Sequence, residues 1–196
     1  TPVSTVEGQT ENDPIVHVCL LVDNETKKHC EEILGRAVTW QAVYAWGESI
    51  LEAGDDPFES EFNLDYEVEF YKHWDIPHNT SLIELKDAAQ KADSGLWNGL
   101  TWRQVTQTTP LDCLVIITGL PKGASNYVGV SEWLGDAFVM TTRANAKLER
   151  IWQHEASHHY GCSDHNPGTG ILCIMSYTCE LNTTQWCQEC KWRINY

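Results

Sequence analysis

The segment HEASHHYGCSDH, residues 154 to 165, holds the residues whose types and spacing most clearly allow chemistry. His154 and His158 are four residues apart, so on a helix both imidazoles emerge on one face within reach of a single ion. Gly161 allows the chain to turn back after the helix, so that Asp164 can point at the same metal. We therefore expect a catalytic zinc ion held by His154, His158 and Asp164, with a fourth position open for water.

Glu155 lies beside these ligands and is expected to act as the general base. Zinc lowers the pKa of its bound water toward neutrality, and Glu155 can take the proton and later return it to the leaving amine. The chemistry predicted is metal-assisted hydrolysis of an amide bond. A bare HExxH pattern on a helix is often accidental, so the assignment depends on Gly161, Asp164 and the Met-Ser-Tyr stretch at residues 175 to 177.

The combined pattern resembles the metzincin metallopeptidases, whose motif is HExxHxxGxx followed by a His or Asp ligand, with a methionine turn downstream. The resemblance implies that Met175, within CIMSY, forms an apolar floor beneath the ligands. It also implies that Tyr177, placed as in the serralysin and astacin branches, helps to stabilise the oxyanion. Aspartate as third ligand, followed by a histidine, is similar to the snapalysin branch; His165 therefore remains the alternative to Asp164 as third ligand.

Cysteine usage indicates a secreted protein. Eight cysteines are an even number, as a complete set of disulfides requires, and they are more than a reducing compartment usually leaves unexplained. The polar first residues look like a lead-in that processing would leave. Asn24, Asn79 and Asn182 begin Asn-x-Ser/Thr acceptors and predict a glycoprotein.

A second, structural zinc competes with disulfides as the role of the C-terminal cysteines. Cys173, two residues before Met175, and the pair Cys187 and Cys190 resemble the archaemetzincins, which carry such a zinc. That family has a cysteine directly after the third ligand, where this chain has His165. A CxxC pair is moderate evidence for zinc, and His165 or Cys162 could complete the site, but we expect disulfides in preference.

Composition excludes two classes of partner. The 13 Lys plus Arg against 28 Asp plus Glu give a net charge of −15, which would repel a phosphate backbone, so no nucleic-acid partner is expected. The chain has no uninterrupted run of about eighteen apolar residues, so no membrane span is expected. Its 196 residues fit one catalytic domain, with an upper part at about 1–161 and a lower part at about 162–196, and we expect a monomer.

Hydrophobic periodicity predicts an α+β fold, and the resemblance implies that it is of zincin or metzincin type: a twisted, mostly parallel sheet with an antiparallel edge strand, two or three helices, and an irregular C-terminal part. The expected strands lie at 15–23, 62–74, 112–120, 128–130 and 137–141. The expected helices lie at 25–53, 81–93 and 144–160, the last carrying the metal ligands and stopping at Gly161.

The predicted function is a secreted zinc endopeptidase with a polypeptide substrate. The substrate would lie extended along the edge strand at 128–131, with Ser176, Tyr177 and Thr178 walling the pocket beyond the scissile bond. One alternative is a metal-stabilised binding or structural protein without turnover, although such a protein has no need of Glu155. Another is an amidase acting on a non-protein substrate such as a cell-wall peptide.

Overall fold

The computed structural model describes residues 14–76, 80–121, 127–144, 146–166, 171–176, 183 and 185–195. Five strands form one sheet; they are β1 Ile15–Asp23, β2 Asp65–Trp74, β3 Cys113–Thr118, β4 Gly129–Ser131 and β5 Ala137–Thr141. The α-helices of the described residues are α1 Asn24–Leu34, α2 Trp40–Phe62, α3 Leu82–Ala89, α4 Trp102–Thr106, α5 Leu148–His159 and α6 Gln188–Asn195. None of these helices combines the length and the apolar character needed to cross a bilayer.

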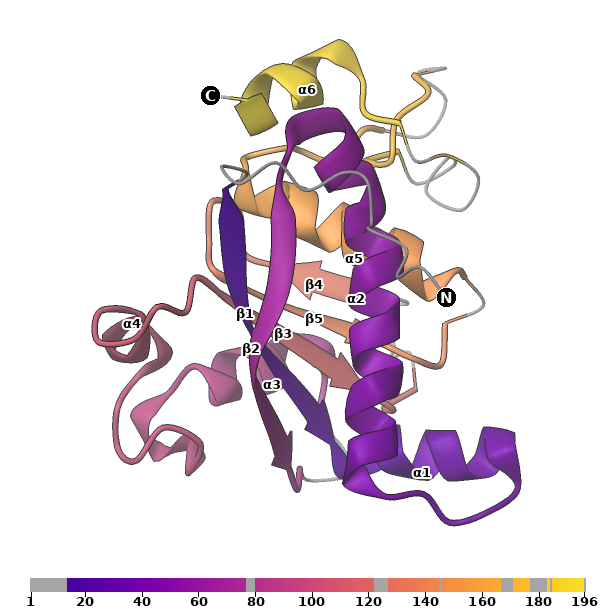
Figure 1. The fold of residues 1–196 in the computed structure, drawn as a ribbon, viewed down its shortest axis with the longest axis vertical. Coiled ribbons are helices and arrows are strands. Elements are labelled where there is room, and N and C mark those ends of the chain that lie inside the picture. The colour runs from indigo at the N-terminus through magenta and orange to yellow at the C-terminus, as the bar shows by residue number, and fades with distance from the viewer. Residues whose placement is uncertain are drawn as a thin grey trace, which may run out of the picture.

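The strand order is β2-β1-β3-β5-β4, in which every pairing is parallel except that of β4 with β5. Because side chains alternate along a strand, the sheet divides its apolar residues between two cores. Leu20 and Val115 pack into the core on the side of α2 and α5, whereas Leu21 and Leu114 pack into the core on the side of α3 and α4. The α+β sheet with an antiparallel edge strand, predicted from the sequence, is confirmed (Figure 1).

The helices differ from the prediction in number and in extent. The described residues form six α-helices where two or three were expected, and α6 occupies part of the C-terminal region expected to be irregular. The helix expected at 25–53 is divided at Gly35, whose φ of 64° ends α1. The helix α2 then continues through Pro57. Tertiary packing outweighs the tendency of glycine and proline to end a helix. A Cβ added to Gly54 would lie 2.7 Å from the Trp152 ring of α5, so the two helices pack closely at this point.

Alternation of apolar and polar residues along β2 predicts one buried face, but only the first half of the strand follows this pattern. Tyr66 is buried, whereas Phe70, expected on the same face, is 49% exposed. The register shifts between Val18 and Cys19 of β1, whose partners are Val68 and Phe70, so Glu69 is an extra residue on β2. Such a bulge interrupts the two-residue period and releases Phe70 from the face that Tyr66 occupies.

The C-terminal residues share the core of α2 and α5. Cys162, Cys173, Ile174, Met175 and Ile194 are buried in that core. The helix α6 lies at the end of the molecule beside the C-terminal end of α2, where Lys191 pairs with Glu61 (Figure 1). The described part of residues 162–195 therefore packs directly against α5, which carries the predicted ligands His154 and His158.

Candidate active site

The helix α5 is fixed in the core by its apolar side, on which Ile151, Trp152 and Ala156 are buried. His154 and Glu155 are also buried, with 7% and 5% of their surfaces exposed. Buried polar groups need partners, so the positions of these two side chains are set by what surrounds them.

Backbone carbonyls orient both imidazoles on α5. Nδ1 of His154 lies 3.1 Å from the carbonyl oxygen of Ile174, and Nδ1 of His158 lies 2.8 Å from that of Cys162. A carbonyl can only accept, so each Nδ1 carries the proton and donates it. Each Nε2 then faces the Asp164 carboxylate, and a donating Nδ1 with Nε2 turned to the ion is the arrangement found at metal-bound histidines.

Asp164 brings a carboxylate to the same point. Its Oδ1 lies 3.1 Å from Nε2 of His154 and 3.6 Å from Nε2 of His158. Tetrahedral zinc with bonds of about 2.0–2.1 Å separates its ligand atoms by about 3.3 Å, so the three residues fit a zinc ion. Gly161, with a φ of 79°, provides the turn that carries the chain from α5 to Asp164.

The pKa values of the two histidines move in opposite directions. Burial lowers the pKa of His154, but the hydrogen bond with Asp164 and the charge of Glu155 outweigh it and raise that pKa to about 9. Burial and the neighbouring His154 lower the pKa of His158. The carboxylates of Asp164 and Glu155 thus stabilise an added proton on His154. A divalent cation bound between these side chains would take the place of that proton.

Glu155 lies against the backbone of the edge strand. A Cβ built on Gly129, the first residue of β4, would lie 2.3 Å from Oε1 of Glu155. Only glycine leaves room for the carboxylate at this place. The backbone of β4 at Gly129 and the Glu155 carboxylate therefore lie close together, although the sequence linked β4 only to substrate binding.

The methionine turn lies next to the histidines. Met175 is fully buried, and its carbonyl oxygen accepts a hydrogen bond of 2.8 Å from the backbone N–H of His165. Ser176 forms a parallel bridge with His165 and is 2% exposed. Tyr177 and Thr178, predicted for the oxyanion and the pocket wall, lie outside the described residues.

A second group of ligand-type side chains lies beside the first, and it consists of His165, Cys173, Cys187 and Cys190. Nε2 of His165 lies 3.1 Å from Sγ of Cys187, and Sγ of Cys190 lies 3.6 Å from Sγ of Cys187 and 3.8 Å from Sγ of Cys173. Tetrahedral zinc with sulfur at about 2.3 Å places two sulfurs about 3.8 Å apart. The group has the residue types and spacing of a structural zinc site.

The expected disulfides are wrong for the cysteines that the structure describes. All seven of these are free thiols. Sulfurs separated by 3.6–3.8 Å are far beyond the roughly 2.05 Å of a disulfide, because Cys173, Cys187 and Cys190 gather around His165 instead of pairing. Cys179 lies outside the described residues.

The predicted glycosylation site at Asn24 lies at the start of α1. Asn24 is the first residue of this helix, and its side-chain oxygen accepts a hydrogen bond from the Ile76 N–H at 3.1 Å. Asn79 and Asn182 lie outside the described residues.

His159, the last residue of α5, packs toward the sheet. Its ring packs on Phe138, with ring centroids 5.4 Å apart, and its Nδ1 lies 3.8 Å from Sγ of Cys113. Burial lowers the pKa of His159 to about 4. The residue therefore belongs to the packing between α5 and the sheet and not to either ligand group.

Several residues of the site carried no sequence signal that identified them. The carbonyls of Ile174 and Cys162 act through backbone atoms, which every residue possesses. Trp186 donates from Nε1 to Oγ of Ser157 at 2.8 Å and so fixes the middle of α5 to the lower part. Gly129 alone offered a hint, since an isolated glycine in a strand pattern often marks a close approach.

Comparisons with known proteins show the fold and nothing finer. No family model matches the sequence, and no curated protein matches it. Among solved structures, metalloproteinase-II from Bacteroides fragilis is 10% identical with a TM-score of 0.58, covering 93% of this chain and 52% of its own. A zinc-dependent peptidase from Methanocorpusculum labreanum is 11% identical with a TM-score of 0.54, covering 91% of this chain and 100% of its own.

A third match, to a chain in the structure of a chaperone-substrate complex, is 13% identical with a TM-score of 0.57 and covers 89% of this chain. The chain spans 27% of the length of that protein and about half of the length of the B. fragilis protein. Identities this low support the architecture alone. The chain has a zincin-type fold, shared with one protein named as a metalloproteinase and one named as a zinc-dependent peptidase.

Proposed function

We propose that this protein is a zinc-dependent endopeptidase of metzincin type. The observation that carries the proposal is the convergence of His154, His158 and Asp164 on one point, with Glu155 on the same helix against the edge strand. The HExxHxxGxxD pattern and the zincin-type fold support it from two independent directions.

The three ligands would hold one catalytic zinc ion. When bound, zinc supplies the Lewis acidity that polarises a peptide carbonyl and acidifies water. Glu155 takes the proton from the attacking water and delivers it to the leaving amine. The contact with Gly129 keeps the Glu155 carboxylate at the strand edge, where the substrate carbonyl would arrive. Tyr177 would donate a hydrogen bond to the developing oxyanion.

The polypeptide substrate would add to the sheet. Among the described residues the strand order ends at β4, which pairs with β5 on one side and with no described strand on the other. An extended peptide can therefore bond to the other edge of β4 from Gly129 to Ser131. Because Gly129 contacts Glu155, this register brings the scissile bond to the general base.

A second zinc ion would have a structural role, held by His165, Cys173, Cys187 and Cys190. Four protein ligands leave no open position for water, which distinguishes a structural from a catalytic zinc. Secretion remains a prediction that has lost its main support, since zinc-bound thiols do not need an oxidising compartment.

The test is cleavage of a generic unfolded protein by the zinc-loaded wild type and by Glu155→Gln. Glutamine keeps the shape of Glu155 but cannot accept the proton, so we expect zinc to remain bound while cleavage falls by about 10³-fold or more. The matched control is Glu149→Gln, an identical change on the same helix, and it should cleave like the wild type.

Two further measurements separate the roles of the site. Removing zinc with a chelator should abolish cleavage, and adding zinc back should restore it. His158→Ala should lose both the catalytic zinc and the cleavage, because it removes a ligand. Full cleavage by Glu155→Gln would refute the assignment of the base. Bound zinc without cleavage by the wild type would favour a binding protein over an enzyme.

A further inference from the structure

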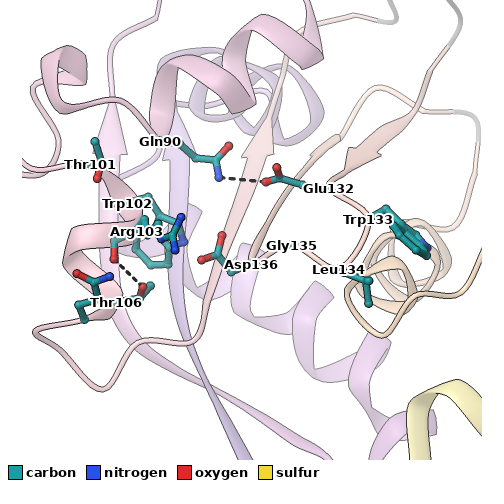
Figure 2. Close-up of a pocket in the computed structure, with 11 residues that line it drawn as sticks. Gln90, Thr101, Trp102, Arg103, Thr106, Glu132, Trp133, Leu134, Gly135 and Asp136 are labelled. Atoms are coloured by element: carbon teal, nitrogen blue, oxygen red, sulfur yellow. Dashed lines mark hydrogen bonds between the residues drawn. The ribbon is translucent and has the colours of Figure 1, made fainter. Parts of the chain in front are cut away.

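A pocket of about 540 Å³ opens at the end of the edge strand, between α4 and the loop from Glu132 to Asp136 that joins β4 to β5 (Figure 2). The volume lies within the range of about 300–1,000 Å³ that is usual for ligand sites. No residue of the proposed zinc sites lines it, so it is a separate feature of the surface.

The loop links this pocket to the active-site helix. The backbone N–H of Leu134 donates a hydrogen bond of 3.1 Å to the carbonyl oxygen of His158. A Cβ added to Gly161 would lie 3.1 Å from the Leu134 side chain, which confirms the close packing. One side of the loop therefore contacts the end of α5, and the other side faces the pocket.

The loop also holds side chains that are unfavourable unless something binds there. Leu134 has a φ of 55°, a left-handed conformation that is costly for a bulky residue, and it is 60% exposed. Trp133 is 58% exposed. Strained backbone and exposed large apolar groups both concentrate at binding sites.

The charges of the pocket favour a cation. Glu132 and Asp136 stand on the loop, and Arg103 of α4 supplies the positive charge on the facing wall, so the charged lining residues sum to minus one (Figure 2). Burial raises the pKa of Asp136, and the charge of Glu132 adds to that effect. A cation between these carboxylates would relieve their repulsion.

The register of the edge strand indicates which substrate residue reaches the pocket. Gly129 contacts Glu155, and Glu132 is three residues further, about 10 Å at 3.3 Å per residue. Antiparallel pairing is about two to three times as frequent as parallel pairing, so the peptide would run opposite to β4. Its N-terminal part then points toward Glu132.

From these observations we propose that the pocket binds an arginine or lysine side chain located three or four residues before the scissile bond of the polypeptide substrate. Glu132 and Asp136 pair with the cation. This inference rests on the proposed peptidase function, which it deepens by naming a substrate preference.

The test compares three peptides that differ at these two positions only and carry arginine, glutamine or glutamate there. For the wild type we expect kcat/KM to be about tenfold higher with arginine than with glutamine. Glu132→Gln and Asp136→Asn should each reduce this preference to about threefold or less. Glu132→Lys should favour the glutamate peptide.

The matched control is Glu67→Gln, which makes the same change of net charge at an exposed position of β2 and should keep the full arginine preference. Binding is measured separately, by fluorescence anisotropy of the labelled peptides on the inactive Glu155→Gln protein. Tighter binding of the arginine peptide, lost in the added Glu132→Gln change, supports the pocket even if no peptide is cleaved by the wild type.

If the arginine peptide binds more tightly but the wild type cleaves no peptide, the proposed peptidase activity is refuted and the proposed pocket is retained. Equal cleavage and equal binding of the arginine and glutamine peptides would overturn the pocket and leave the peptidase intact. A preference for the glutamate peptide in the wild type would also overturn it, because Arg103 would then be the group that selects the substrate.

Discussion

Replacing Gly129 by alanine should displace the proposed general base, Glu155, and leave the rest of the site unchanged. The added Cβ would lie 2.3 Å from Oε1, 2.6 Å from Cγ and 2.7 Å from Cδ of Glu155. Ordinary contact begins at 3.4 Å, so the carboxylate must move by about 1 Å. A misplacement of about 1 Å can cost about 10²-fold in rate, and we expect kcat/KM to fall by about that factor.

The atoms that must yield belong to a side chain and not to the backbone, so the fold should survive. We therefore expect both zinc ions and the melting temperature to be retained while peptide hydrolysis is lost. The assay measures kcat/KM, zinc content and thermal unfolding on the same preparation. Gly47→Ala is the matched control, because its added Cβ would meet Leu20 at 3.1 Å, away from the site. Wild-type kcat/KM in Gly129→Ala would refute the reasoning.

The remaining predictions concern the two ligand groups and one buried acid. Asp164→Ala should lower the zinc content measured by metal analysis from about two ions per chain to about one, because the cysteine group is untouched; complete loss of zinc would contradict two separate sites. Cys187→Ser should lose the other ion and also lower the melting temperature, since a structural zinc contributes to folding; an unchanged melting temperature would argue against it. Burial raises the pKa of Asp55 to about 8, although its carboxylate accepts a hydrogen bond from the Tyr66 N–H. The folded state then binds more protons than the unfolded state between about pH 4 and pH 8, so the free energy of unfolding should fall as the pH rises through this window, by at most about 6 kcal/mol. Asp55→Asn should flatten this dependence in denaturant titrations, and an equal slope in both proteins would disprove the shift.

Regular periodicity made most of the sheet predictable. The strands β1 and β5 lie where continuous apolar runs placed them, because a strand buried on both faces needs apolar residues at every position. The alternating pattern of β2 fails beyond Glu69, because a bulge depends on the partner strand and leaves no local pattern in the sequence. The helix expected to end at residue 53 instead continues through Pro57 to Phe62, where Phe58 and Gly54 pack on Trp152 of α5.

The candidate site could be predicted where helical spacing decides the geometry. His154 and His158 share a face of α5 because they are four residues apart. The role of the cysteines could not be predicted in the same way, since their number fits both disulfides and a metal. Their arrangement depends on how the turn after α5 and the helix α6 meet, which is a tertiary relation between segments distant in sequence.

The choice between Asp164 and His165 as third ligand follows from how these neighbours are held. The backbone N–H of His165 donates a hydrogen bond to the carbonyl oxygen of Met175, and His165 forms a parallel β-bridge with Ser176. The chain is therefore extended at this point. Successive side chains of an extended segment point to opposite sides. Asp164 accordingly faces His154, while Nε2 of His165 faces Cys187. Sequence spacing allowed either residue to reach the proposed catalytic zinc, whereas in the structure Asp164 lies with the two histidines and His165 lies with the cysteines.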